Sequence, residues 1–247
     1  GLSAWDETID NYTPLVEMND VLDGMSALGV NRAIVVGTSR GGIIAMLMGV
    51  ARPNAMAAVV LNDIGPTIEA QGLARIKTYI GRTPAPNDWD DAVAITHRLH
   101  EGQFTALSEA DWRTFARMTY RDVDGRPVGD YDPALAQTFD GIEFDQPMPS
   151  LWNEFRTLAD LPVLAIRGGA SDLMSAATLE AMEEAHPGLE AVTIDGQGHA
   201  PLLIHTPILQ RISAFITNAE GSGPPVDALM PRETAVYDPD AAAEAGD

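Results

Sequence analysis

Hydrophobic residues recur along this chain at two spacings, and the alternation between them predicts its elements. From Thr13, apolar residues return every three or four positions, with Pro14 in the first turn and Gly29 just beyond the last. This spacing predicts an amphipathic helix. Residues 33–36 are apolar without a break, which is typical of a strand buried on both faces of a parallel sheet. The first regular elements are therefore a helix and a buried strand.

The same alternation continues along the chain, with one long interruption. We expect a helix at 40–51, a strand at 57–61, a strand at 162–166, a helix at 175–186, a strand at 191–194 and a helix at 207–217. Strands that alternate with helices through short connections predict an α/β fold with a parallel sheet.

The interruption divides the chain into a core and an insertion. Between residues 65 and 159, polar helical segments are separated by clusters of proline, glycine and aspartate. We interpret residues 65–159 as a helical cap, inserted into a core made of residues 1–64 and 160–218. Residues 219–247 contain seven acids and one arginine, a composition that predicts a disordered acidic tail.

One cap segment, residues 108–120, has a clear helical pattern. It begins with a sequence that resembles a capping box and carries Trp112, Phe115 and Met118 on roughly one side. These side chains either pack the cap against the core or line a ligand pocket, and the pattern alone leaves both interpretations open.

Charge and composition exclude several classes of function. The chain has 247 residues, with 15 Lys plus Arg against 36 Asp plus Glu, so its net charge of −21 repels phosphate backbones and anionic lipids. We therefore expect neither a nucleic acid nor a membrane as a partner. Cysteine is absent, which excludes thiolate nucleophiles, disulfides and thiolate metal sites. The chain opens without an apolar signal core, and we expect a cytoplasmic protein.

The candidate nucleophile lies directly after the first predicted strand, in Gly-Thr-Ser-Arg-Gly-Gly at 37–42. A tight strand-to-helix turn forces its central residue, Ser39, into a strained conformation, and Gly37 and Gly41 supply the room for that turn. The loop lacks the glycine spacing of a dinucleotide site and the lysine of a phosphate-binding loop. The pattern thus favours a nucleophilic serine.

A nucleophilic serine needs a base, and the base needs an orienting carboxylate. His199 follows the last predicted strand in a Gly-rich loop, at the same sheet edge as Ser39. Asp172 follows the strand at 162–166, and Asp63 occupies a similar place one strand earlier. We favour Asp172 as the acid and give Asp63 a structural or supporting role.

The sequence offers little support for a metal site. His97 and His100 are three residues apart on a predicted cap helix, without the spacing of a zinc-binding helix, and an exposed helix explains them. The acidic turn at 122–125 lacks calcium ligands at the required positions, since Tyr120 and Tyr131 stand there. We expect no metal and no cofactor.

These motifs together resemble those of the α/β-hydrolase superfamily, in particular its esterase-like members with a helical cap. The resemblance spans about residues 1–217 and implies an α/β-hydrolase fold with Ser39, Asp172 and His199 as the catalytic triad. It also implies that the backbone N–H of Arg40 forms part of the oxyanion hole. The substrate class that it implies is a small-molecule acyl compound, most simply a carboxylic ester.

The resemblance has one departure, because the strands that open the family's fold, with an oxyanion loop, have no counterpart here. Residues 1–3 resemble the end of a later loop of the family, so we expect an N-terminally incomplete member and a poor catalyst. Carbon–carbon bond hydrolysis, lactone hydrolysis and a non-catalytic binding remnant stay open as alternatives. The oligomeric state, the acyl group and the alcohol group have no signal in the sequence.

Overall fold

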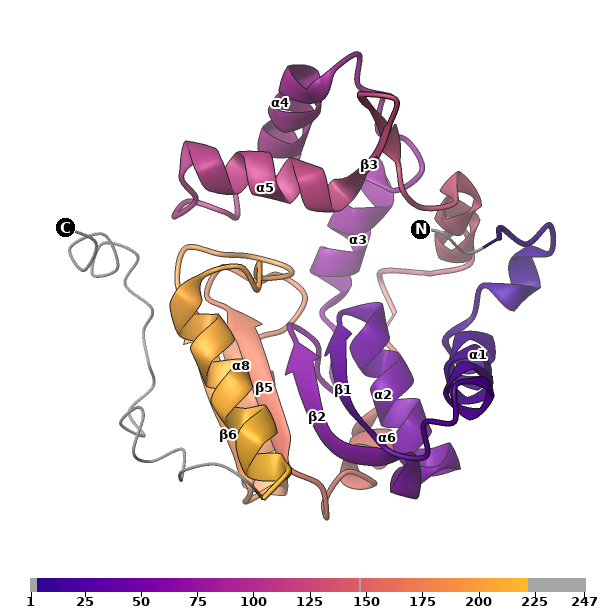
Figure 1. The fold of residues 1–247 in the computed structure, drawn as a ribbon, viewed down its shortest axis with the longest axis vertical. Coiled ribbons are helices and arrows are strands. Elements are labelled where there is room, and N and C mark those ends of the chain that lie inside the picture. Colours follow the sequence, from indigo (N-terminus) through magenta and orange to yellow (C-terminus); the bar gives the residue numbers. More distant parts are fainter. Residues whose placement is uncertain (1–3, 147, 222–247) are drawn as a thin grey trace.

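Four parallel strands form the central sheet of the chain, in the order β1-β2-β5-β6 (Figure 1). Their bounds are β1 (Ala33–Thr38), β2 (Met56–Asn62), β5 (Val163–Gly168) and β6 (Leu189–Ile194). The structure is a computed structural model that describes residues 4–146 and 148–221. The predicted parallel α/β sheet is confirmed, and each predicted strand lies within about two residues of its place.

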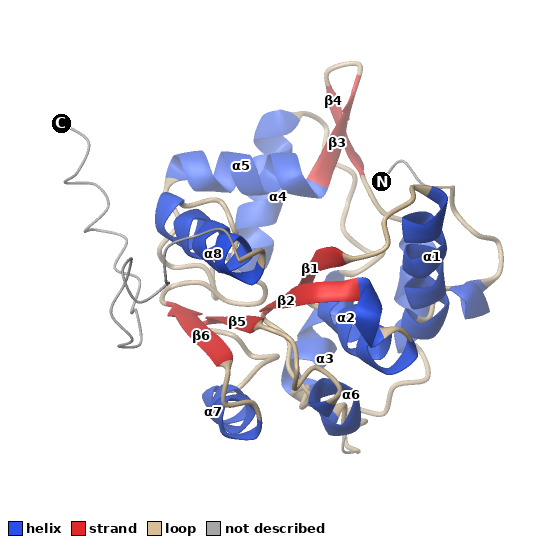
Figure 2. Cartoon of the chain, turned by 60° about the horizontal axis from the view of Figure 1, so that its bottom comes forward, coloured by secondary structure: helices blue, strands red, loops and turns tan. Residues whose placement is uncertain are grey.

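Helices cover both faces of this sheet (Figure 2). The helices of the core are α1 (Pro14–Ala27), α2 (Arg40–Ala51), α6 (Trp152–Arg156), α7 (Ala176–Ala185) and α8 (Thr206–Ala219). Val59 and Leu61 of β2 share one hydrophobic cluster with α1, α2, α6 and α7. Their neighbours Ala58 and Val60 belong to the opposite cluster, against α8. Successive residues of a strand point to opposite faces, so an unbroken apolar strand fills both cores.

The first predicted helix is confirmed with its capping residue. The Thr13 hydroxyl accepts a hydrogen bond from the N–H of Val16 at 3.3 Å, and Pro14 occupies the first turn of α1. Gly29, with φ of 69°, follows the helix in the left-handed conformation that glycine adopts readily. The helix ends where the sequence places its end signals.

Three helices stand above the carboxyl ends of the strands (Figure 1). They are α3 (Ala70–Tyr79), α4 (Trp89–His100) and α5 (Glu109–Thr119), followed by a hairpin of β3 (Tyr120–Val123) and β4 (Arg126–Gly129). The short 3-10 helices are η1 (Ile9–Asn11), η2 (Pro53–Ala55) and η3 (Pro133–Phe139). The three helices and the hairpin lie within the cap predicted at 65–159, and from here on the name cap is kept for residues 70–142. Helix α6, further along the chain, packs on the core side against α2.

The hairpin is the element that the sequence interpretation missed. Its turn is formed by Asp124 and Gly125, both with positive φ, at 51° and 80°. Two consecutive residues in this conformation make the turn type that matches the twist of a two-stranded ribbon. The acidic segment considered above as a calcium loop is therefore a hairpin turn.

Helix α5 turns two of its three large side chains inward. Trp112 is buried, its ring stacks on Phe115 at 6.0 Å between centroids, and both pack with Leu202 of the core. Met118, expected on the same side, is 58% exposed. Trp112 and Phe115 thus hold the cap on the core beside the segment that follows His199.

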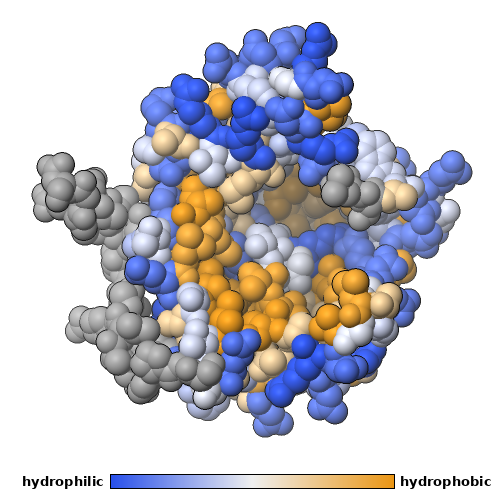
Figure 3. Space-filling view, in the orientation of Figure 1, coloured by the Kyte–Doolittle hydropathy of each residue, from blue (hydrophilic) through white to orange (hydrophobic). Residues whose placement is uncertain are grey.

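The surface is charged on the cap and apolar around part of the sheet. Figure 3 shows hydrophobic residues over the sheet and α8, and a hollow between the cap and the core.

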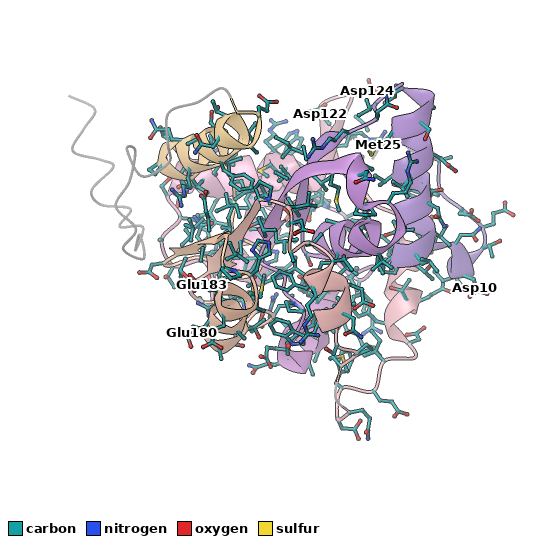
Figure 4. The ribbon with its side chains drawn as sticks, turned by 90° about the horizontal axis from the view of Figure 1, so that it is seen from below. Asp10, Met25, Asp122, Asp124, Glu180 and Glu183 are labelled. Atoms are coloured by element: carbon teal, nitrogen blue, oxygen red, sulfur yellow. The ribbon has the colours of Figure 1, made fainter. Side chains whose placement is uncertain are left out.

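Strand β1 lies at one edge of the sheet. It pairs with β2 alone among the described residues, and its Val36 is 49% exposed. Acidic side chains such as Glu180 and Glu183 lie at the periphery (Figure 4). None of the described helices is long and apolar enough to cross a membrane.

Two expectations concern residues outside the described ranges. Residues 1–3, which resemble the end of a loop, are not described, and neither is most of the acidic segment, residues 222–247. Both expectations stay predictions.

Candidate active site

Ser39 occupies a sharp turn between β1 and α2. Its φ of 49° and ψ of −117° are strained for a residue with a side chain. A Cβ on Gly37 would lie 2.5 Å from the carbonyl oxygen of Gly41, and one on Gly42 would lie 2.2 Å from Ile64. A Cβ on Gly41 would meet nothing within 4 Å. The tight turn therefore requires glycine at 37 and 42, and position 41 has no such steric requirement.

His199 joins Ser39 to a carboxylate. Its Nε2 lies 2.9 Å from Ser39 Oγ, and its Nδ1 lies 2.8 Å from Oδ2 of Asp63. His199 comes from the loop between β6 and α8, while Asp63 directly follows β2. Both side chains are buried, at 5% and 0% exposure. The three groups form one continuous line of hydrogen bonds, in which the histidine and the carboxylate are shielded from solvent and Ser39 is half-buried.

Asp63 is held by further hydrogen bonds. Its Oδ1 accepts the N–H of Gly168 at 2.7 Å, and its Oδ2 accepts the hydroxyl of Ser171 at 2.6 Å. The Ser171 oxygen in turn accepts the N–H groups of Leu173 and Met174. With the contact to His199, a fully buried carboxylate has partners on both oxygens. Sequence reasoning missed Ser171 altogether, since a serine beside a predicted acid gives no signal of its own.

The prediction that Asp172 orients His199 is wrong. The carboxylate of Asp172 instead binds Arg75 of α3 in a bidentate pair, at 2.7 Å to Nε and 3.0 Å to Nη2. A Cβ on Gly72 would lie 2.7 Å from the Asp172 carbonyl oxygen, which shows how closely α3 packs on this loop. Burial acts to raise the pKa of Asp172, but hydrogen bonds from Arg75 and Gln103 outweigh it and lower the pKa.

Two buried amides hold the loop that carries His199, one by a bond to the sheet and one by a bond within the loop. Asn62, the last residue of β2, donates to the Pro201 carbonyl at 3.1 Å and to the Thr38 hydroxyl at 3.2 Å. The Gln197 side-chain oxygen accepts the N–H of Leu202 at 2.7 Å. These bonds hold the loop on both sides of His199, so its ring has a defined position relative to Ser39.

Arg40 contributes to the turn through its backbone and its side chain. It is the first residue of α2, where backbone N–H groups have no partner within the helix and the helix dipole is positive. Its guanidinium forms a bidentate pair with Glu17 of α1, at 2.7 Å for both bonds, and donates to the Tyr12 carbonyl at 2.7 Å. These contacts fix the peptide between Ser39 and Arg40.

The other histidines have different partners. His97 pairs with Glu101 at 3.0 Å, His186 lies 3.1 Å from two backbone carbonyls, and His205 lies 3.0 Å from Asp111. No group of three or more candidate metal ligands occurs within the described ranges. His100, expected on an exposed helix, is instead enclosed by the rings of Tyr79, Phe104 and Phe115.

Comparisons with known proteins show which proteins this chain resembles. The sequence profile described as "Alpha/beta hydrolase family" matches residues 4–207. The chain is 26% identical to the 3-hydroxybutyrate-oligomer hydrolase of Cupriavidus necator over 231 residues, which cover 89% of this chain and 76% of the relative. It is 29% identical to the 2-(acetamidomethylene)succinate hydrolase of Mesorhizobium japonicum, over 74% of this chain and 64% of the relative.

Solved structures are also similar to this chain. A crystal structure of an alpha/beta hydrolase from Novosphingobium aromaticivorans superposes with a TM-score of 0.79 and 31% identity, over 87% of this chain and 76% of that chain. An esterase from Mycobacterium tuberculosis is 20% identical with a TM-score of 0.62, which shows a shared fold.

Proposed function

Because this chain belongs to the α/β-hydrolase family, we propose that it hydrolyses a carboxylic ester of a small molecule through an acyl-enzyme formed on Ser39. The observation that carries this proposal is the line of hydrogen bonds from Ser39 through His199 to Asp63, at 2.9 and 2.8 Å. Nucleophile, base and orienting carboxylate stand at the distances that proton transfer requires.

In the first half of the proposed reaction, Ser39 Oγ attacks the ester carbonyl while its proton passes to Nε2 of His199. Asp63 holds the other ring nitrogen and stabilises the imidazolium that forms. The oxyanion of the tetrahedral intermediate accepts a hydrogen bond from the N–H of Arg40, at the positive end of α2. When the intermediate collapses, His199 returns the proton to the departing alcohol, and the acyl group stays on Ser39.

In the second half, water repeats these steps. His199 takes a proton from the water molecule that attacks the acyl-enzyme, and gives it back to Ser39 Oγ as the acid leaves. Every proton moves between His199 and an oxygen atom, so these steps consume only the ester and water. The names of the two curated relatives, both hydrolases, support this reaction class.

The geometry of the proposed triad favours catalysis over the alternative of a binding remnant. Asp63 is fully buried and Ser39 has a positive φ, and both features cost stability without serving a protein that only binds. Carbon–carbon bond and lactone hydrolysis would use the same groups and stay alternatives to the ester reaction.

Covalent labelling tests the proposal. A fluorophosphonate should attach to Ser39 alone, detected by intact mass and by mapping of the modified peptide. Ser39→Ala should abolish the label, and His199→Ala should slow labelling by at least ~10²-fold, because the base is lost. Ser213→Ala, at an exposed serine of α8, is the matched control and should label like the natural chain. Labelling of another residue, or none, would overturn the proposal.

A further inference from the structure

A polar cluster lies beneath the cap, next to the loop of His199. It consists of Arg75 and Tyr79 from α3, His100 and Gln103 from the end of α4 and the turn that follows, and Asp172 from the loop after β5. We call these residues the Arg75 cluster. Apart from Asp172, none of them was singled out for catalysis, and the proposed triad uses none of them.

The Arg75 cluster adjoins the proposed catalytic base. A Cβ on Gly198 would lie 2.5 Å from the Cβ of Gln103, so Gln103 packs directly on the residue that precedes His199. His100 lies within electrostatic range of His199 as well. A substrate group bound by the Arg75 cluster would therefore lie beside the loop that carries His199.

Two nitrogen atoms of the cluster have no hydrogen-bond partner among the described residues. Asp172 occupies Nε and Nη2 of Arg75, while Nη1 is buried without a partner. Nδ1 of His100 is likewise buried without one. A buried donor of a charged group that lacks an acceptor is expensive to maintain, and a native structure rarely keeps one without a reason. A bound ligand that supplies a hydrogen-bond acceptor would explain these unpaired nitrogen atoms.

The surroundings favour an acceptor with negative charge. The rings of Tyr79, Phe104 and Phe115 enclose His100, so water contributes little screening. Burial first, and the positive charge of Arg75 second, lower the pKa of His100 to about 4. The charge of Arg75 thus remains effective at this site even though Asp172 is bound to it.

We propose that the Arg75 cluster binds a carboxylate of the substrate, so that the ester cleaved at Ser39 is anionic, such as the monoester of a dicarboxylic acid. Nη1 of Arg75 donates to this carboxylate, and neutral His100, with its proton on Nδ1, donates a second hydrogen bond. Asp172 acts as a positioning residue that holds the guanidinium in place. This inference rests on the proposed ester hydrolysis at Ser39.

The whole-molecule charge makes such a site necessary for an anionic substrate. A net charge of −21 repels anions from the surface. A buried arginine beside the loop that carries His199 counters that repulsion at the one place where the substrate binds. Turnover of an anionic ester should accordingly rise with ionic strength, and turnover of a neutral ester should not.

Matched substrates test the proposal in a pH-stat assay. Monomethyl succinate, glutarate and adipate are compared with their dimethyl esters, and the readout is the ratio of kcat/KM for each monoester to that for its diester. The double variant Arg75→Met with Asp172→Asn removes the guanidinium without leaving a buried carboxylate unpaired. It should lower the best ratio by about 10- to 100-fold, the value of a charged hydrogen bond.

Two further variants keep the test decisive. Asp172→Asn alone removes the competing negative charge, while the amide oxygen can still accept a hydrogen bond from Arg75 and keep it in place, so this variant should raise the same ratio through a lower KM for the monoester. Arg113→Met removes a positive charge from an exposed position on the cap and should leave the ratio unchanged. A ratio insensitive to both cluster variants, with their fold intact by circular dichroism, would overturn the carboxylate site.

Binding to an inactive chain separates this inference from the proposed function. On a Ser39→Ala background, monomethyl glutarate should bind in isothermal titration calorimetry, and the double variant should weaken its Kd by about 10-fold or more. If no ester is turned over but this binding and its loss are observed, the proposed function fails and the carboxylate site stands. Equal Kd values with and without Arg75 would contradict the site directly.

Discussion

Asp63 occupies a conformation that sets the direction of its side chain. Its φ of 55° is positive, a region that aspartate visits more readily than most residues. The turn directly after β2 brings its carboxylate against Gly168, Ser171 and His199. The proposed orienting acid thus follows the strand adjacent to that of the proposed nucleophile.

His100 should make the stability of the protein depend on pH. Its pKa is lowered to about 4 in the folded chain, against about 6.5 when unfolded, so between these values the unfolded chain binds the extra proton. Stability should therefore fall as pH drops from 6.5 towards 4, by at most about 3 kcal/mol.

Urea unfolding at several pH values measures this effect. His100→Phe fits the aromatic surroundings and carries no titrating group, so its unfolding free energy should vary less over the same pH range. His97→Phe, at an exposed histidine on the same helix, is the control and should keep the natural dependence. A slope unchanged by His100→Phe would contradict the assigned burial.

Sequence reasoning chose the two residues that the structure brings together, Ser39 and His199, but of the two candidate acids it favoured Asp172, and the carboxylate that contacts His199 is that of Asp63. Asp63 and Asp172 both follow strands at the same sheet edge, and the sequence pattern does not show which of them contacts the histidine. Which of the two carboxylates reaches His199 depends on contacts between residues that are far apart in the sequence. Arg75, from the cap, binds Asp172, and Ser171 binds Asp63. Such long-range pairs leave no periodic signal in a single sequence.

At the scale of elements, the turn between β1 and α2 depends on glycine for steric reasons that differ by position. Gly37→Ala would place a Cβ within 2.6 Å of backbone atoms that cannot move aside. We expect a loss of about 3 kcal/mol or more of unfolding free energy, and loss of labelling at Ser39.

Gly41→Ala is the matched substitution in the same turn. Its Cβ meets nothing within 4 Å, and alanine favours a helix over glycine by about 1 kcal/mol, so stability should be kept or raised. Chemical denaturation of the two variants checks this pair. Equal destabilisation by both would show that the steric account of the turn is wrong.

Elements with strong periodicity were predicted well, and those that depend on pairing were not. Helix α2 was predicted over its whole length, and α1 was predicted together with its N-capping residue, because their signals are local. The hairpin of β3 and β4 was missed because its strands have four residues each, too few to show an alternating pattern. The Asp-Gly turn at 124–125 was the available signal.

At the scale of the whole molecule, the cap is attached to the core beside the proposed catalytic loop. Thr105 and Ala106 donate backbone hydrogen bonds to Gly196, and His205 of the core lies 3.0 Å from Asp111 of the cap. Asp111 also caps α5 through Ser108. The cap and the loop of His199 should therefore open together.

Hydrogen exchange tests this coupling. His205→Ala removes one contact between cap and core, so amides in residues 103–112 and 196–202 should exchange faster, by about 3- to 10-fold. Amides of β2 and β5 should be unaffected. His186→Ala, at a histidine bonded within the core, is the control and should leave the cap unchanged. Faster exchange confined to α8 would contradict a shared opening.

The identity of the orienting acid is the central claim of the proposed mechanism, and the steady-state kcat of two variants tests it. On dimethyl glutarate, Asp63→Asn should lower kcat by about 10⁴-fold, because His199 loses the partner that sets its tautomer and stabilises its charged form. Asp172→Asn, which removes an equivalent charge bound to Arg75, should lower kcat by less than about 10-fold. The opposite order, a collapse of kcat in Asp172→Asn and a mild loss in Asp63→Asn, would contradict the triad of Ser39, His199 and Asp63.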